Sequence, residues 1–222
     1  MFPRLITTLF GAAAISVAAA CGGAAGASSA GTTPAPRNAP PDQVARADSV
    51  RSSYTPADVA FMTGMIHHHA QALVMSRMAP THGASGSLQI MAERIIVGQN
   101  DEIALMQRWL RDRNQPVPDP EGASTDTHGT GHAMHMPGML SAEQLAELDA
   151  ARGPEFDRVF LTYMIQHHQG AITMVEELFN TSGGQGDAIF KIASDIAADQ
   201  DSEIARMRSM LREMLFEPVG SR

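Results

Sequence analysis

Residues 61–79 read FMTGMIHHHAQALVMSRMA, and residues 160–178 read FLTYMIQHHQGAITMVEEL. The two stretches align without a gap, and both contain a methionine, an adjacent pair of histidines and a second methionine at the same offsets. A repeat of this kind indicates one structural unit used twice in the chain. We therefore expect two equivalent helices that determine the fold.

The residues shared by the two copies lie on one face of a helix. Each residue of an α-helix turns by about 100°, and the shared positions fall within an arc of roughly 120°. The inward residues are Met65, His68, His69, Ala72 and Met75 in the first copy, and Met164, His167, His168, Ala171 and Met174 in the second. His67 points roughly to the opposite side and is replaced by Gln166 in the second copy. The repeat thus preserves an inward stripe.

The repeat includes a second helix in each half. These partner helices share a Gln-x-x-Glu-Ile-x-x-Met pattern, which places Gln99, Glu102, Ile103 and Met106 in one half and Gln200, Glu203, Ile204 and Met207 in the other. Neither helical hairpin can bury its apolar stripe alone, so we expect both to pack as one four-helix bundle of the all-α class. The segment between the hairpins is long enough to cross the bundle.

Capping and turn residues predict where the helices begin and end. Thr-Pro-x-Asp at residues 55–58 and Ser-x-x-Gln at residues 141–144 are N-terminal capping patterns, and glycine or proline follows most helical stretches. The expected helices cover residues 56–79, 87–113, 141–151, 154–180 and 187–216.

The chain is predicted to contain an export signal, a tether and the bundle. Residues 1–20 combine one charge, an apolar run and small residues before Cys21, which resembles a bacterial lipoprotein signal with Cys21 as the lipidated residue. Ordinary cleavage nearby, with an unused cysteine, is the alternative. Residues 21–53 are rich in Gly, Ala, Ser and Pro and predict a disordered tether. The bundle is expected over residues 54–217, with repeats at 54–113 and 141–217 and a linker at 114–140.

Composition excludes several classes of function. The net charge of −8 argues against nucleic acid as a partner, and no polybasic patch is present to bind anionic lipid. Membrane attachment is expected only through a lipid on Cys21, with the protein in the periplasm or at the cell surface. The chain has no nucleophile and base at recognisable spacing, no phosphate-binding glycine loop and no cofactor fingerprint. We therefore expect no enzymatic activity.

The inward stripe supplies donors suited to copper. Thioether sulfur favours Cu(I), and imidazole binds copper, zinc and nickel. Methionine stripes are also typical of core packing, but packing does not explain two buried histidine pairs, whose burial is costly. The sequence therefore predicts a copper ion as cofactor, with the candidate ligands Met65, His68, His69, Met75, Met164, His167, His168 and Met174.

The partner helices add polar residues to the same predicted core. Glu102 and Glu203 either ligate metal or accept the second ring N–H of a histidine and fix its tautomer. We favour the second role because soft Cu(I) gains little from a carboxylate. Gln99 and Gln200 are expected to be further hydrogen-bond partners. Met106 and Met207 share these stripes and are candidates for the surroundings of the metal.

A second cluster of donors lies in the linker. It comprises His128, His132, Met134, His135, Met136 and Met139. Short His/Met tracts in exported proteins capture metal without a fold, and a flexible linker with incidental histidines is the alternative. His82, in the loop after the first helix, is expected to be solvated.

These motifs resemble a bacterial family of exported, Met/His-rich, CopM-like copper-binding proteins that is labelled a domain of unknown function. The resemblance rests on Met-Ile-x-His-His with a later methionine, at residues 65–75 and 164–174, and on the partner pattern at 99–106 and 200–207. It extends over about residues 54–216. The resemblance implies a ferritin-like bundle and a role in copper binding and resistance.

Three functions are compatible with the sequence. The preferred one is an extracytoplasmic protein that binds Cu(I), or Cu(II), and buffers the ion or transfers it to a partner protein. The second is a lipid-anchored interaction module whose Met/His face binds a protein, which requires the histidine pairs to be accessible. The third is a di-iron or di-manganese oxidoreductase. It is disfavoured because the Glu-x-x-His motif of such centres does not occur in the chain.

Overall fold

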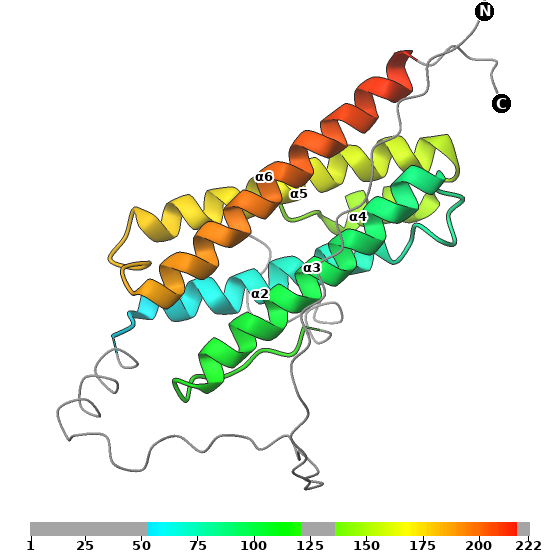
Figure 1. Cartoon of the computed structure of the whole chain (residues 1–222). Coiled ribbons are helices and arrows are strands. Elements are labelled where there is room, and N and C mark those ends of the chain that lie inside the picture. Colours follow the sequence, from blue (N-terminus) through cyan, green and yellow to red (C-terminus); the bar gives the residue numbers. More distant parts are fainter. Residues whose placement is uncertain (1–52, 121–135, 217–222) are drawn as a thin grey trace, which may run out of the picture. The chain divides into compact units, whose positions relative to one another are not determined.

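Five α-helices and no strands make up the part of the chain that the computed structural model describes, residues 53–120 and 136–216 (Figure 1). The helices are α2 (Pro56–Ser76), α3 (Gly86–Arg111), α4 (Ala142–Ala150), α5 (Pro154–Phe179) and α6 (Asp187–Phe216). The all-α class is confirmed. The export signal, Cys21 and the tether predicted before residue 53 lie outside the described residues.

The helix starts follow from the capping chemistry of the sequence. Thr55 accepts a hydrogen bond from the backbone N–H of Asp58, while the Asp58 carboxylate accepts one from the backbone N–H of Thr55. Ser141 and Gln144 form the same reciprocal box at the start of α4. Each box satisfies N–H groups that have no partner within the helix. Helix α2 ends at Ser76, earlier than the expected residue 79, because the chain enters turns before Gly83, whose φ is 70°.

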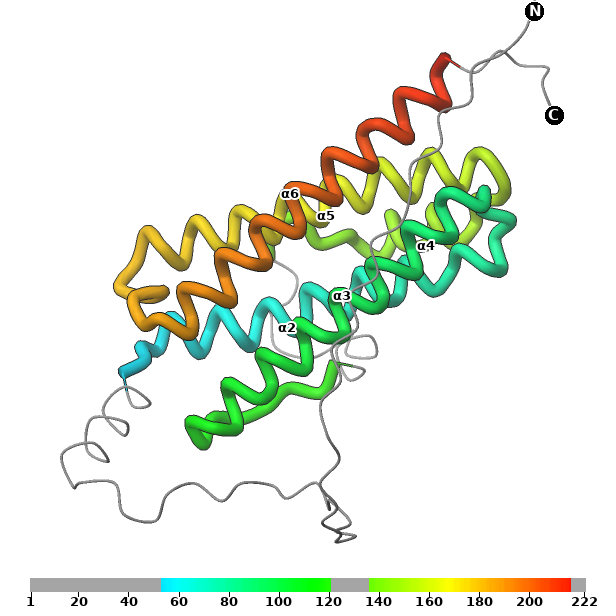
Figure 2. The backbone as a smooth tube through the Cα atoms, in the orientation of Figure 1, coloured from blue at the N-terminus to red at the C-terminus, as the bar shows by residue number. Residues whose placement is uncertain are grey.

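The helices form two antiparallel hairpins, α2 with α3 and α5 with α6 (Figure 2). The hairpins meet chiefly through α2 and α5, which run in opposite directions side by side (Figure 1). Helix α4 packs against α5. The two helices that carry the repeated Met/His stretch are therefore the central pair of the bundle.

Two buried aspartates join the hairpins at equivalent places. Asp58 Oδ1 accepts a hydrogen bond from the backbone N–H of Gly184 at 2.6 Å, and both carboxylate oxygens of Asp157 accept from the backbone N–H of Ser85 at 3.2 Å. Asp58 and Asp157 occupy matching positions of the repeat, and Ser85 and Gly184 both lie in the loop before the second helix of their hairpin. Each hairpin thus binds the loop of the other, which fixes the relation between α2 and α5.

Two apolar clusters form the core on either side of the bundle centre. One contains Phe61, Trp109 and Leu178, and the other contains Leu88, Phe156 and Phe160. None of the described helices is both long and apolar enough to cross a lipid bilayer.

Candidate metal centre

The predicted ligands face the interior. All four histidines of the repeated pairs have a relative exposure of 0%. The four methionines of the stripe are also buried, and the least buried of them, Met174, is 8% exposed. The inward direction of the stripe, predicted from helical periodicity, is therefore present in the structure.

The stripes of the two hairpins pack against each other in an antiparallel arrangement. Met65 from α2 and Met174 from α5 belong to one core cluster, whereas Met75 and Met164 belong to the other. Met106 of α3 lies in the first cluster and Met207 of α6 lies in the second, so each partner helix adds one methionine to one cluster. Each end of the paired stripes therefore combines methionines from both hairpins.

His68 and His167 lie between the two methionine clusters. They occupy equivalent positions of the repeat, and their ring centroids are 3.9 Å apart with the ring planes inclined at 39°. The ring centroids of His167 and its neighbour His168 are 6.2 Å apart. Imidazoles from both hairpins thus converge inside the bundle.

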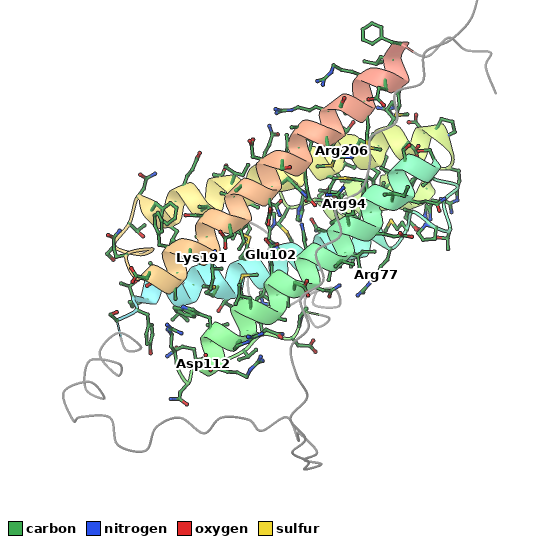
Figure 3. The ribbon with its side chains drawn as sticks, viewed as in Figure 1. Arg77, Arg94, Glu102, Asp112, Lys191 and Arg206 are labelled. Atoms are coloured by element: carbon green, nitrogen blue, oxygen red, sulfur yellow. The ribbon has the colours of Figure 1, made fainter. Side chains whose placement is uncertain are left out.

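The outer histidine of each pair forms a hydrogen bond with a carboxylate of its partner helix. His69 Nε2 is 2.7 Å from Glu102 Oε2, and His168 Nε2 is 2.6 Å from Glu203 Oε2. Glu102 lies in the middle of α3 on the side that faces α2 and α6 (Figure 3). A carboxylate accepts the Nε2–H proton and leaves the lone pair on Nδ1. The geometry matches the role in which these carboxylates fix the histidine tautomer.

The inner histidines, His68 and His167, differ from the outer pair in their hydrogen bonds, because neither bonds a carboxylate. His68 Nε2 donates to the backbone carbonyl of Pro137 at 3.0 Å, whereas neither ring nitrogen of His167 has a partner. The Nδ1 atoms of His68, His69 and His168 are likewise buried without a partner. Buried polar atoms are costly when unpaired. These unpaired nitrogens fit a bound metal ion, because a ligating histidine presents one bare lone pair while its other nitrogen donates to an acceptor.

Burial keeps the inner histidines neutral. It lowers the pKa of His68 from 6.5 to about 3, with a further contribution from the neighbouring His69. The pKa of His167 also lies well below 6.5, first because of burial and then because of His68, His168 and His69. A neutral imidazole has the lone pair that a metal ion requires.

Asp199 is a neighbour of the site that the sequence did not predict. Asp199 is exposed, and partial loss of solvent contact raises its pKa, with further increases from the carboxylates of Glu102, Glu203 and Asp195. The equivalent position on α3 is Gly98, so the repeat does not contain a second aspartate that would have pointed to this residue. The carboxylate of Asp199 therefore interacts electrostatically with carboxylates of both hairpins.

The side-chain amides of Gln99 and Gln200 are buried, and each contains at least one atom without a hydrogen-bond partner. Gln99 and Gln200 are buried, at 2% and 1% exposure. Neither amide atom of Gln99 has a hydrogen-bond partner, and the carbonyl oxygen of Gln200 also lacks one. The structure therefore shows no hydrogen bond from the Gln99 side chain, and its role beside the metal stays a prediction. Within residues 53–120 and 136–216, no group of three or more His, Cys, Asp or Glu side chains is arranged to hold a metal ion.

The linker cluster is described only at its C-terminal end. His128, His132, Met134 and His135 lie outside the described residues, so a metal-capturing tract there stays a prediction. Met136 packs against the first core cluster, which contains Met65 and Met174. Met139 is half-buried, and its backbone N–H donates to the Met136 carbonyl at 3.3 Å.

The expectation that His82 is solvated is wrong. His82 is 6% exposed, its Nε2 lies 3.0 Å from the Asp149 carbonyl and 3.1 Å from Asp149 Oδ1, and its ring packs on Phe156 at a centroid distance of 5.0 Å. Its backbone carbonyl accepts from Gly153 N–H at 2.8 Å. Since α4 returns over this loop from a distant part of the sequence, local sequence gave no sign of the contact.

Two duplicated hairpins around a buried set of histidines and methionines define an all-helical bundle protein with a candidate soft-metal centre. The chain belongs to the family described as domain of unknown function DUF305, whose sequence model matches residues 58–211. A comparison with curated proteins finds no match.

Solved structures share this fold. The DUF305 fragment from Deinococcus radiodurans is 28% identical, with a TM-score of 0.60, and the match covers 72% of this chain and 98% of that one. CopM in its Cu(II)-bound form is 30% identical, with a TM-score of 0.55 and coverage of 70% and 96%. CopM in its Cu(I)-bound form is 28% identical, with a TM-score of 0.54 and coverage of 72% and 98%.

Proposed function

We propose that this protein binds copper outside the cytoplasm, with a preference for Cu(I), and buffers the ion or transfers it to a partner protein. The observation that supports the proposal most strongly is the set of unpaired, buried Nδ1 atoms of His68, His69, His167 and His168. These nitrogens lie between two clusters of methionine thioethers, and this donor combination suits Cu(I).

The relatives add support for copper as the ion. CopM has been solved with both Cu(I) and Cu(II), and it covers about seven tenths of this chain. In this proposal copper is the cargo of a binding protein and not the centre of an enzyme. Export, with attachment through a lipid on Cys21, completes the proposal and rests on the sequence alone.

The geometry disfavours the interaction module. That function requires a partner protein to reach the Met/His face, but the four histidines are fully buried and two of them stack across the hairpin interface. A protein that binds through this face would first have to separate the hairpins.

An anaerobic titration tests the proposal. The protein competes for Cu(I) with a chromophoric chelator of known affinity, and the variant H68Q/H69Q/H167Q/H168Q is compared with H67Q. H67Q is a matched control because it replaces the neighbouring, half-buried histidine with the residue found at the equivalent position, Gln166. We expect H67Q to bind like the wild-type protein and the fourfold variant to lose tight binding while its helical circular dichroism persists.

Equal Cu(I) affinity in a folded fourfold variant would reject the histidine site. If the wild-type protein removes no copper from the chelator, copper binding itself is rejected. Loading with Zn(II) in the same assay compares metals, because a thioether-rich site is expected to favour Cu(I).

A further inference from the structure

The end of the crossover linker, residues 136–140, packs directly onto the central helices. The Pro137 carbonyl accepts the hydrogen bond of His68 Nε2 at 3.0 Å. Three residues further along the chain, the amide of Gln71 donates to the Leu140 carbonyl at 3.1 Å and accepts from the Leu140 N–H at 2.7 Å. The segment is therefore held to α2 at two residues, one of which, His68, belongs to the predicted ligand stripe.

Glycines let the segment approach α5 at backbone distance. A Cβ built on Gly170 would lie 2.0 Å from the carbonyl oxygen of Pro137, and one built on Gly138 would lie 2.6 Å from the carbonyl oxygen of Gln166. Gly138 also has a φ of 76°, a conformation that disfavours other residues. The position of the segment is thus fixed by close backbone packing as well as by hydrogen bonds.

The segment contacts the bundle at positions where the two repeats differ. Gly64 of the first copy is Tyr163 in the second, and Gln71 is Gly170. Both Gln71 and Gly170 contact the segment, and Gln166, which replaces a histidine, donates to the Gly138 carbonyl at 3.4 Å. The helices α2 and α5 thus differ at the positions that contact this segment, which occurs only once in the chain.

The absence of a side chain at Gly64 leaves room for Met136. A Cβ at Gly64 would lie 3.4 Å from Met136 Sδ and 3.4 Å from Met174 Cε, so the two methionine side chains are neighbours. Met136 packs against the core cluster that contains Met65, Met106 and Met174. The crossover segment thus brings a thioether to one end of the predicted ligand stripe.

We propose that Met136 is a further soft donor of the copper site, at the end formed by Met65 and Met174. This inference rests on the proposed function. A neutral thioether adds a soft ligand without adding charge to a buried site. Because the crossover segment occurs once, Met136 has no counterpart related by the repeat, and the two ends of the stripe are inequivalent toward the metal.

The test compares M136L with M78L. Leucine keeps apolar bulk and removes only the sulfur, and Met78 is a matched control because it is half-buried like Met136 but packs against the other core cluster. Cu(I) affinity is measured by chelator competition, and copper-edge X-ray absorption of the loaded proteins gives the ratio of sulfur to nitrogen ligands. We expect M136L to bind Cu(I) about tenfold or more weakly, with a lower sulfur ratio, and M78L to match the wild-type protein.

The outcomes separate this inference from the proposed function. If the wild-type protein binds Cu(I) through its histidines but M136L retains both the affinity and the sulfur ratio, Met136 is only a packing residue and this inference alone fails. If M78L loses as much Cu(I) affinity as M136L, the loss is not specific to the sulfur of Met136 and the inference also fails. A wild-type protein that binds no Cu(I) overturns both.

Discussion

Acidification is expected to destabilise the metal-free protein through its two inner histidines. Burial lowers the pKa of His68 to about 3 and holds that of His167 well below 6.5, whereas both titrate near 6.5 in the unfolded chain. At pH values between the folded and the unfolded pKa, these histidines are protonated in the unfolded chain and neutral in the folded protein. Stability is therefore retained above pH 6.5 and is lost as pH falls toward the folded pKa.

The size of the effect follows from proton uptake by the unfolded state. With both imidazoles neutral in the folded protein, each histidine removes about 2 kcal/mol of unfolding free energy between pH 7 and pH 5, and the pair removes about 4 kcal/mol. A typical domain has roughly 5 to 15 kcal/mol in total, so the loss is readily measured.

Urea unfolding of the apo protein, followed by circular dichroism at pH 7 and pH 5, measures this loss. The variant H68Q/H167Q corrects for other titrating groups, and the wild-type protein should lose about 4 kcal/mol more than the variant. Nitrogen-15 NMR of the imidazoles gives an independent result, with His68 and His167 remaining neutral at pH 5. An equal pH effect in both proteins, or imidazoles that protonate near pH 6, would show that burial does not hold these histidines neutral.

Three further predictions concern the surroundings of the site. E102Q replaces the carboxylate that binds His69 and should weaken Cu(I) binding about tenfold in chelator competition without loss of helix content; unchanged affinity would contradict its role in fixing the tautomer. G170A should destabilise the fold by about 1 to 3 kcal/mol in urea unfolding, because its Cβ would lie 2.0 Å from a carbonyl oxygen of the crossover segment. G98A, where a Cβ meets nothing within 4 Å, should instead stabilise by up to about 1 kcal/mol, and equal effects of the two changes would refute the argument. D157A should lower the free energy of unfolding by roughly 1.5 to 3 kcal/mol, because it removes the acceptor of the part-buried Ser85 N–H that joins the two hairpins.

The central helices could be predicted because their information is local. Helical periodicity alone placed His68 and His69 inward with Met65 and Met75, and the repeat required the same of the second copy. Capping residues such as Thr55 and Ser141 marked helix starts because their hydrogen bonds join residues three apart. The bundle then followed from the need to bury two identical apolar stripes.

The remaining contacts join segments far apart in the sequence. The stacking of His68 on His167 depends on how α2 and α5 align, and the docking of Met136 depends on glycines at positions 138 and 170 that no periodicity connects. Local sequence places His82 in solvent because it does not show that α4 lies over the loop. The partner of His82, Asp149, belongs to α4. Such contacts depend on tertiary packing and not on helix propensity.

A crystal structure of the protein loaded with Cu(I) under anaerobic conditions would show where the ion binds and which side chains hold it. Anomalous scattering at the copper edge locates the ion independently of the protein coordinates. We expect copper inside the bundle, bound by Nδ1 of histidines from the repeated pairs and by methionine sulfur, with Glu102 and Glu203 still hydrogen-bonded to Nε2 of His69 and His168. Copper bound only outside the bundle, or a loaded bundle with copper on the two glutamates and no histidine ligand, would contradict it.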